Sequence, residues 1–223
     1  MDGLLLVDKP KGWTSFDVVA KVRGILKKSG VQKPKVGHTG TLDPLATGLL
    51  VLTLGSYTKR AQEFSKLDKT YEVTMKLGQT STTGDEEGEK TVVSKHQPTK
   101  AEIATNLRLF VGEIKQVPPA YSAIKVGGQR AYKLARAGKA VKLEPRKVKI
   151  YSIELTNYSY PFVEFRATVS SGTYIRSLVE DIGRQLGTGA YMSDLRRTQI
   201  GSFHVDNAVT PEKVDIGRPI PLD

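Results

Sequence analysis

Short apolar runs and alternating segments along the chain predict strands. We expect them over residues 4–7, 48–55, 71–77, 148–155 and 163–169. The run enclosed by Gly48 and Gly55 is apolar almost throughout, which is typical of a strand buried on both faces. In residues 71–77 apolar side chains, beginning with Tyr71, alternate with polar ones, which predicts a half-buried strand. The last two segments are close enough in sequence to predict a hairpin.

Three segments have helical spacing instead. Thr14 followed by Asp17 fits a capping box, and Thr99 followed by Glu102 fits a second one, so a helix is expected to begin at each. The apolar positions expected on one face of each helix are Phe16, Val19, Val22 and Leu26, then Ile103, Leu107 and Phe110, then Ile175, Leu178, Val179, Ile182 and Leu186. Gly30 and Gly187 follow the first and third sets and are expected to end those helices.

The order of these elements predicts a strand-rich α+β fold, with helices packed on a largely antiparallel mixed sheet. The 223 residues fit one domain or two small lobes, and no internal repeat or low-complexity tract is present. Hydrophobic residues make up 39% of the chain, which is enough for a packed core.

Positive charge is concentrated in one segment, residues 115–149. The chain has a formal net charge of +11, and this segment contains ten basic residues against one acid, Glu144. It also contains Tyr121, Tyr132 and the pair Gly127-Gly128, which suggests a mobile basic arm. Such an arm would attract phosphates by counterion release and could stack its tyrosines on bases or sugars. The alternative is a solvated basic surface. The acidic cluster at residues 85–89 is expected to be an exposed loop, with a separate role open for Asp85.

The absence of cysteine removes disulfides, thiolate metal sites and cysteine nucleophiles. No apolar run is long enough for a signal peptide or a membrane span. We therefore expect a soluble, cytoplasmic protein with no membrane partner.

A glycine-rich segment, residues 37–48, could hold a reactive group. It lacks the Gly-Lys-Ser/Thr ending of a P-loop, because Gly48 is followed by Leu49, and nucleotide hydrolysis is disfavoured. What remains is one carboxylate, Asp43, whose backbone is restricted by Pro44. A lone Asp before Pro is more often a turn residue than a nucleophile, so both interpretations stand on the residues alone.

Two further segments carry candidate side chains. Arg176 lies in the first turn of the third helix and could direct a permanent positive charge at a carboxylate or phosphate, although by spacing alone it would more often be a surface residue. Leu195 precedes a basic pair and is expected in the core. The three histidines, at positions 38, 96 and 204, are far apart in sequence, so no metal site is predicted. Chemistry based on a carboxylate, without cofactor, is what these residues leave open.

Four motifs together resemble the bacterial tRNA pseudouridine synthase B family. They are Asp8-Lys9-Pro10 with Gly12, Thr14 and Ser15; residues 37–49; Gly172-Thr173-Tyr174-Ile175-Arg176-Ser177-Leu178; and Leu195-Arg196-Arg197-Thr198 with Gly201. They occur in order over about residues 2–205. This agreement favours a catalytic Asp43 over an ordinary turn residue.

The resemblance implies a pseudouridine synthase-like fold and the isomerisation of the T-loop uridine of tRNA, position 55, to pseudouridine. It implies no cofactor and no metal. Asp43 matches the family's catalytic aspartate, Tyr71 the tyrosine that stacks on the flipped base, and Arg176 the arginine that pairs with the aspartate. Residues implied to contact the RNA or line the pocket are His38, Tyr174, Leu195, Asp85, Lys125 and Tyr132, of which Lys125 and Tyr132 lie in what resembles an inserted RNA-clamping thumb.

The resemblance also implies a domain arrangement. We expect a catalytic domain over residues 1–210 with the thumb insertion at about 115–149, a tail over 211–223, and no counterpart of the family's usual C-terminal RNA-binding domain. The expected partner is the T arm of tRNA, bound by a monomer. The alternative is a non-catalytic tRNA-binding or tRNA-folding factor that uses the same basic surface.

Overall fold

The computed structural model describes residues 2–122, 124–139 and 141–214. The chain divides into two compact units. Unit 1 consists of Met1–Glu72 and Leu195–Asp223, and unit 2 consists of Val73–Asp194. Two strands, β4 (Lys69–Leu77) and β12 (Ala190–Ile200), contribute residues to both units.

In unit 1 the strands follow the order β1 (Gly3–Lys9), β3 (Thr47–Leu54), β12, β4. The β1 and β3 strands are antiparallel, β3 and β12 are parallel, β2 (Val36–His38) pairs with β3, and β13 (Phe203–His204) pairs with β12. Seven of the eight β3 residues are buried. The prediction of a strand covered on both faces is therefore confirmed.

Helix α1 (Ser15–Lys28) covers one face of this sheet. Its capping box is present, since Asp17 N donates to Thr14 Oγ1 and the Asp17 carboxylate accepts from Thr14 N at 2.7 Å. Its buried positions are Ser15, Val18, Val19, Val22 and Leu26. The prediction is wrong for Phe16, which is 63% exposed, because the buried face is centred further round the helix, on Val18 and Val22.

The other face of the unit 1 sheet packs against the segment after β3. The 3-10 turn Gly55–Arg60 leads into α2 (Ala61–Ser65), whose Phe64 is buried with Leu4, Leu6, Leu49, Val51 and Ile200. Successive residues of β1 and β3 thus enter two different cores, as the alternation of side chains in a strand requires.

In unit 2 the strand order is β12, β4, β11 (Phe162–Val169), β10 (Arg146–Ser159), β7 (Gly112–Gln116). The β10 and β11 strands form the predicted antiparallel hairpin, and β10 also pairs with β7 in antiparallel fashion. A small two-stranded sheet, β5 (Gln79–Ser81) with β6 (Lys90–Val92), lies between β4 and α3 in the chain.

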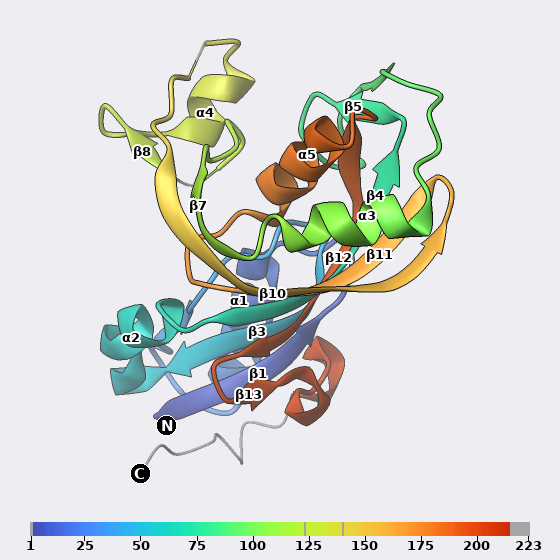
Figure 1. Ribbon diagram of the computed structural model, residues 1–223. Coiled ribbons are helices and arrows are strands. Elements are labelled where there is room, and N and C mark those ends of the chain that lie inside the picture. Colours follow the sequence, from blue (N-terminus) through green and yellow to red (C-terminus); the bar gives the residue numbers. More distant parts are fainter. Residues whose placement is uncertain (1, 123, 140, 215–223) are drawn as a thin grey trace. The chain divides into compact units, whose positions relative to one another are not determined.

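The two helices predicted in this unit are present. The α3 helix (Lys100–Arg108) begins with the Thr99–Glu102 capping box and buries Ile103 and Leu107, while Phe110 lies beyond its end. The α5 helix (Ile175–Gln185) buries the predicted apolar positions 175, 178, 179 and 182, together with Arg176. Figure 1 shows α3 lying across the long, curved β10 strand, with which it is in contact.

The basic segment, residues 115–149, has regular structure. Between β7 and β10 it forms a hairpin of β8 (Lys125–Val126) and β9 (Gln129–Arg130), followed by α4 (Ala131–Arg136). Its Gly127 and Gly128 adopt positive φ angles of 56° and 83°, which the hairpin turn requires. Figure 1 shows these elements at one end of β7 and β10.

The architecture confirms a mixed α+β fold with a largely antiparallel sheet. The division into a domain over residues 1–210 and a tail remains a prediction. Of the tail, Pro211–Lys213 forms a 3-10 turn, and residues 215–223 lie outside the described residues.

Candidate functional site

The candidate residues fall in both units. Unit 1 contains His38, Asp43, Tyr71 and Leu195, and unit 2 contains Asp85, Lys125, Tyr132, Tyr174 and Arg176.

Asp43 lies on a loop that is fixed at several points of unit 1. The preceding residue, Leu42, is buried and tied to the first residue of α1, because Leu42 N donates to Ser15 Oγ at 2.8 Å and Ser15 Oγ donates to Leu42 O at 3.1 Å. Asp43 O accepts from Ala46 N at 3.1 Å, which closes a turn just before β3. The Asp43 side chain is half-buried. The loop therefore holds a carboxylate at a defined place on the sheet.

Arg197 shapes the loop of Asp43, and the sequence reasoning did not single it out. It is 1% exposed, and its guanidinium donates to Leu49 O at 2.8 Å, Gly40 O at 3.1 Å and Thr41 O at 3.5 Å. These carbonyls lie on both sides of Asp43 in the chain, so one buried cation joins the two ends of its loop. A signal for this role existed, because Arg197 is two residues from the apolar Leu195 on one strand and so shares its buried face.

Glycine at position 48 makes the close approach of this arginine possible. A Cβ on Gly48 would lie 2.2 Å from Arg197 O, and the φ of Gly48 is +102°. No other residue fits there without displacing β12 from β3.

The electrostatics of the loop are dominated by buried cations. Lys9 is fully buried, with Nζ donating to Trp13 O at 2.7 Å and Pro10 O at 3.0 Å. Burial lowers the pKa of Lys9 to about 8, against an upward effect of the Asp43 charge and a further lowering by Arg197. Lys9 thus remains mainly protonated at neutral pH and adds positive charge near the Asp43 carboxylate.

His38 ends β2, immediately before the glycine-rich loop. Burial, with a smaller effect of Arg197, lowers the pKa of His38 below its ordinary value of 6.5. Its imidazole is therefore neutral at pH 7. Among the described residues, its buried Nδ1 has no hydrogen-bond partner.

Tyr71 and Leu195 are the other two candidates in unit 1. Both are 7% exposed, Tyr71 on β4 and Leu195 on β12. The expectation that Leu195 belongs to the core is confirmed. Tyr71 lies on the apolar side of its alternating strand, as the pattern predicted.

Arg176 in unit 2 is buried, contrary to the ordinary expectation for an arginine in the first turn of a helix. Its Nη1 lies 3.6 Å from an Asp85 carboxylate oxygen and donates to Thr83 O at 3.1 Å, and its Nη2 donates to Tyr121 O at 2.8 Å. Both side chains of the pair are buried. The guanidinium is thus held between the Asp85 loop and the basic segment.

Asp85 departs from the rest of its acidic cluster. Glu86 and Glu87 are exposed, as expected for a loop, whereas Asp85 is 5% exposed. Its Oδ1 accepts from Thr83 Oγ1 at 2.5 Å and from Glu87 N at 3.1 Å. Asp85 therefore orders its own loop and forms a buried ion pair with Arg176.

Tyr174 immediately precedes α5, and its backbone is fixed by a buried glutamine. Tyr174 N donates to Gln116 Oε1 at 2.8 Å, and Gln116 Nε2 donates to Tyr174 O at 3.1 Å. One turn on, Ser177 Oγ donates to Val117 O at 2.8 Å. Together with the Arg176 bond to Tyr121 O, these contacts join the start of the basic segment to the first turn of α5.

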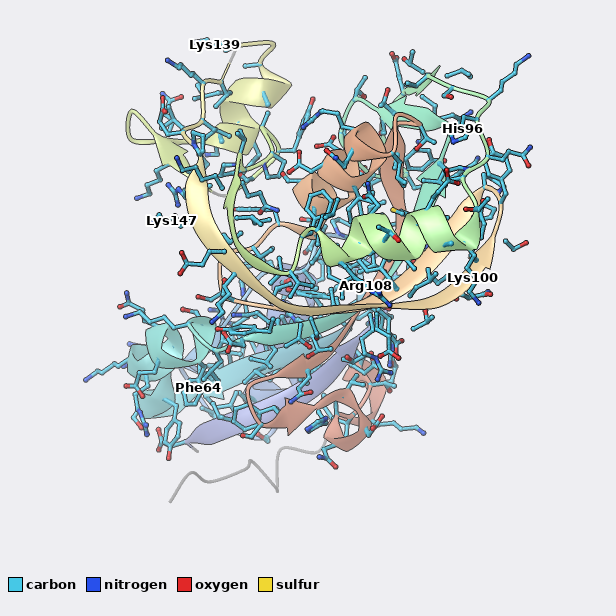
Figure 2. The ribbon with its side chains drawn as sticks, viewed as in Figure 1. Phe64, His96, Lys100, Arg108, Lys139 and Lys147 are labelled. Atoms are coloured by element: carbon cyan, nitrogen blue, oxygen red, sulfur yellow. The ribbon has the colours of Figure 1, made fainter. Side chains whose placement is uncertain are left out.

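The basic segment presents its charge to solvent. All of its cations whose side chains are described are exposed, namely Lys115, Lys125, Arg130, Lys133, Lys139, Lys142, Arg146, Lys147 and Lys149. Tyr132 is half-buried at the start of α4. Figure 2 shows Lys139 at the outer tip of the segment and Lys147 where β10 begins. This arrangement forms an extended positive surface.

The described part of the chain contains neither a metal-ligand cluster nor a membrane helix. Among the side chains that the structure describes, no three His, Asp or Glu residues come together as a metal site. Within the same residues, no helix is long and apolar enough to cross a membrane.

Two family models match this chain. Residues 27–175 match the TruB family pseudouridylate synthase N-terminal domain, and residues 176–216 match the tRNA pseudouridylate synthase B C-terminal domain. Among solved structures, a Cbf5-Nop10-Gar1 complex contains a similar chain, with a TM-score of 0.72 and 35% identity. That match covers 93% of this chain and 51% of the other, so the present chain spans about half of its length. The fold is that of the pseudouridine synthases.

Curated relatives define the family more closely. The chain is 46% identical to tRNA pseudouridine synthase B of Burkholderia mallei over 215 residues, covering 96% of this chain and 70% of the relative. It is 47% identical to the tRNA pseudouridine synthase B of Pseudomonas fluorescens, covering 96% and 69%. The chain belongs to the TruB family of pseudouridylate synthases, an isomerase family.

Proposed function

We propose that this protein converts the T-loop uridine of tRNA, position 55, to pseudouridine. Family membership supports this activity, and so does the loop that holds the Asp43 carboxylate between α1, β3 and Arg197. The fixed backbone of the loop that carries Asp43 is the observation on which the proposal chiefly rests, because the reaction needs one well-placed negative charge and no external reactant.

The reaction rearranges bonds within one nucleotide. The bond from the sugar C1′ to N1 of uracil breaks, the base turns in the pocket, and C1′ bonds to C5. The C5 proton leaves to solvent and N1 takes up a proton, so atoms and electrons balance without a cofactor. As C1′ loses its base it becomes electron-poor, as in glycoside cleavage, and a carboxylate can stabilise or attack it. This is the role proposed for Asp43.

The remaining roles follow the family resemblance. Arg176 is proposed as the cationic partner of the catalytic carboxylate, and Tyr71 as the ring on which the flipped base stacks. Extruding the base costs a few kcal/mol, of which stacking can return about 1–3 kcal/mol. His38, Tyr174 and Leu195 are proposed to line the pocket, and Asp85 to act near the extruded nucleotides.

The RNA is proposed to bind to the basic segment, with Lys125 and Tyr132 in contact with the T arm. The exposure of its cations supports electrostatic binding that reads no sequence. The proposal also includes a cytoplasmic location and action as a monomer. Size-exclusion chromatography with and without tRNA would test the monomer.

Substitution of Asp43 tests the activity. With a T-arm RNA carrying tritium at C5 of uridine, we expect wild type to release tritium and Asp43→Asn to release none while binding the RNA within a few fold. Asp206→Asn makes the same chemical change at an exposed position of unit 1 and is expected to keep activity. Appreciable turnover by Asp43→Asn would reject its catalytic role. A wild-type protein that refolds misfolded tRNA but forms no pseudouridine would favour a folding factor.

A further inference from the structure

A second basic surface lies on unit 1, away from the basic segment in the chain. Residues 11–35 contain seven basic residues and one acid, Asp17. Of these cations, Lys11, Lys21, Lys27, Lys28, Lys33 and Lys35 are exposed and Arg23 is half-buried. The carboxylate of Asp17 already accepts from Thr14 N and Thr14 Oγ1, both at 2.7 Å. Asp17 is thus the one acid in this stretch, and its position is fixed by the cap of α1.

The outer face of α1 places an aromatic ring in line with two of the cations. Phe16 and Arg23 are seven residues apart, and Arg23 and Lys27 four, so the three follow one stripe of the helix. Phe16 is 63% exposed, and the Arg23 guanidinium lies 5.8 Å from its ring centroid. An exposed aromatic ring beside cations is the arrangement that proteins use to bind nucleic acid by stacking and charge together.

The loop after α1 carries two more exposed cations, Lys33 and Lys35. Arg23 Nη2 donates to Val36 O at 2.7 Å, which fixes the end of this loop beside the middle of the helix. Lys33 and Lys35 are exposed just before Val36. We call Phe16, Arg23, Lys27, Lys33 and Lys35 the α1 surface. It continues along the chain into β2 and then into the loop of Asp43.

Two ordinary explanations account for only part of this arrangement. Lys27 and Lys28 lie in the last turn of α1, where cations interact favourably with the helix dipole. That effect does not explain Lys33 or Lys35, which follow the helix, or the exposure of Phe16. A merely solvated surface usually mixes both signs of charge, whereas residues 11–35 contain seven cations and one acid.

Because the proposed function assigns the T arm to the basic segment, we propose that the α1 surface binds the phosphate backbone of the tRNA substrate outside the T arm, with Phe16 stacking on a base or sugar. The inference rests on the proposed function for the identity of the RNA. An anionic membrane is the less favoured partner, because a single exposed phenylalanine gives little apolar area for insertion. The α1 surface gives the unit that carries Asp43 an RNA-binding site of its own, independent of the basic segment.

Charge reversal tests the proposal on a full-length tRNA transcript and on an isolated T-arm hairpin. For Lys27→Glu combined with Lys33→Glu, we expect at least about a fivefold loss of affinity for full-length tRNA near 0.1 M salt, and a salt dependence of affinity that is flatter by roughly 0.7–0.9 for each phosphate interaction removed. Binding of the hairpin is expected to fall much less. Lys95→Glu with Lys100→Glu is the matched control on unit 2, where both lysines are exposed, and should change affinity less than twofold.

The aromatic ring has its own test. Phe16→Leu is expected to weaken tRNA binding severalfold, and Phe16→Tyr, which keeps the ring, to restore it. Equal affinities for wild type and the Lys27/Lys33 pair on full-length tRNA would overturn the proposal. The proposal would also be overturned if the wild-type protein bound phosphatidylserine vesicles and the Lys27→Glu/Lys33→Glu variant lost that binding but kept its affinity for tRNA.

These outcomes are separable from failure of the proposed function. Tritium release from the T-arm hairpin reports the chemistry, and affinity for the full-length transcript reports the α1 surface. If the wild-type protein forms pseudouridine and the Lys27→Glu/Lys33→Glu variant keeps its affinity for full-length tRNA, only the proposal for the α1 surface is rejected. If the wild-type protein forms no pseudouridine but the Lys27→Glu/Lys33→Glu variant loses affinity for full-length tRNA, only the proposed reaction is rejected.

Discussion

The guanidinium of Arg197 is the group in unit 1 whose removal we expect to cost most. In Arg197→Met the side chain remains long enough to fill its space, but three carbonyl oxygens lose their donor. Two of these hydrogen bonds, to Leu49 O and Gly40 O, are 2.8 and 3.1 Å long. The third, to Thr41 O at 3.5 Å, is too long to contribute much.

The magnitude follows from the two shorter bonds. A hydrogen bond to a charged group contributes about 1.5–3 kcal/mol, so Arg197→Met should lower the free energy of unfolding by about 3–6 kcal/mol. That is a large fraction of the about 5–15 kcal/mol by which a domain is stable. Because the same bonds hold the loop of Asp43, turnover should fall as well, even at temperatures where the variant stays folded.

The neighbouring arginine is a matched control. Arg196 donates to the two Asp8 carboxylate oxygens at 2.8 and 3.1 Å, but the two side chains are 35% and 28% exposed. Solvent screens such a pair, and Arg196→Met should cost only about 1 kcal/mol or less.

Urea unfolding followed by the fluorescence of the single tryptophan, Trp13, measures both changes. Arg197→Lys, which keeps the charge but not the planar fork, should fall between wild type and Arg197→Met and remains measurable if the latter does not fold. If Arg197→Met lost no more stability than Arg196→Met, the claim that the buried Arg197 guanidinium holds the loop of Asp43 in place would be refuted.

Three other perturbations have defined outcomes. The pKa of Lys9 is about 8 in the folded protein and 10.5 in the unfolded chain, so between pH 8 and 10.5 the unfolded chain binds more protons than the folded one. The free energy of unfolding should therefore rise from pH 8 to 10.5. Lys9→Met should remove up to about 3 kcal/mol of that rise, as measured by urea titrations at several pH values. Gly48→Ala should prevent folding, seen as a loss of circular dichroism, because its Cβ would meet Arg197 O. Gln116→Leu should lower the unfolding free energy by about 1–3 kcal/mol because it removes two hydrogen bonds to Tyr174, and an unchanged urea midpoint would contradict this.

Local signals in the sequence were enough for most of the fold. The two capping boxes predicted where α1 and α3 begin, since each depends on only four consecutive residues. The buried β3 and the alternating β4 followed from side-chain periodicity. Phe16 shows the limit of such patterns, because its spacing to Val19 is helical and yet it lies off the buried face.

The contacts that shape the candidate site were less accessible to sequence reasoning. Arg197 binds carbonyls of residues about 150 positions away, and Arg176 binds Thr83 and Tyr121, which are also distant in the chain. Every residue carries a backbone oxygen, so the amino-acid types of these partners do not show that a buried guanidinium binds them. The pattern offered Arg176 as a candidate cation but favoured a surface position for it, and it gave no sign that Asp85 is buried while the glutamates beside it are exposed.

The way in which α5 holds the basic segment has a consequence for variation among relatives. Two of the three attachments end on main-chain oxygens, those of Val117 and Tyr121, which every amino acid carries. Replacing the side chains there would leave the acceptors in place. Mutation can therefore remodel the outer surface for different RNA shapes, while Gln116, Arg176 and Ser177 keep its attachment intact.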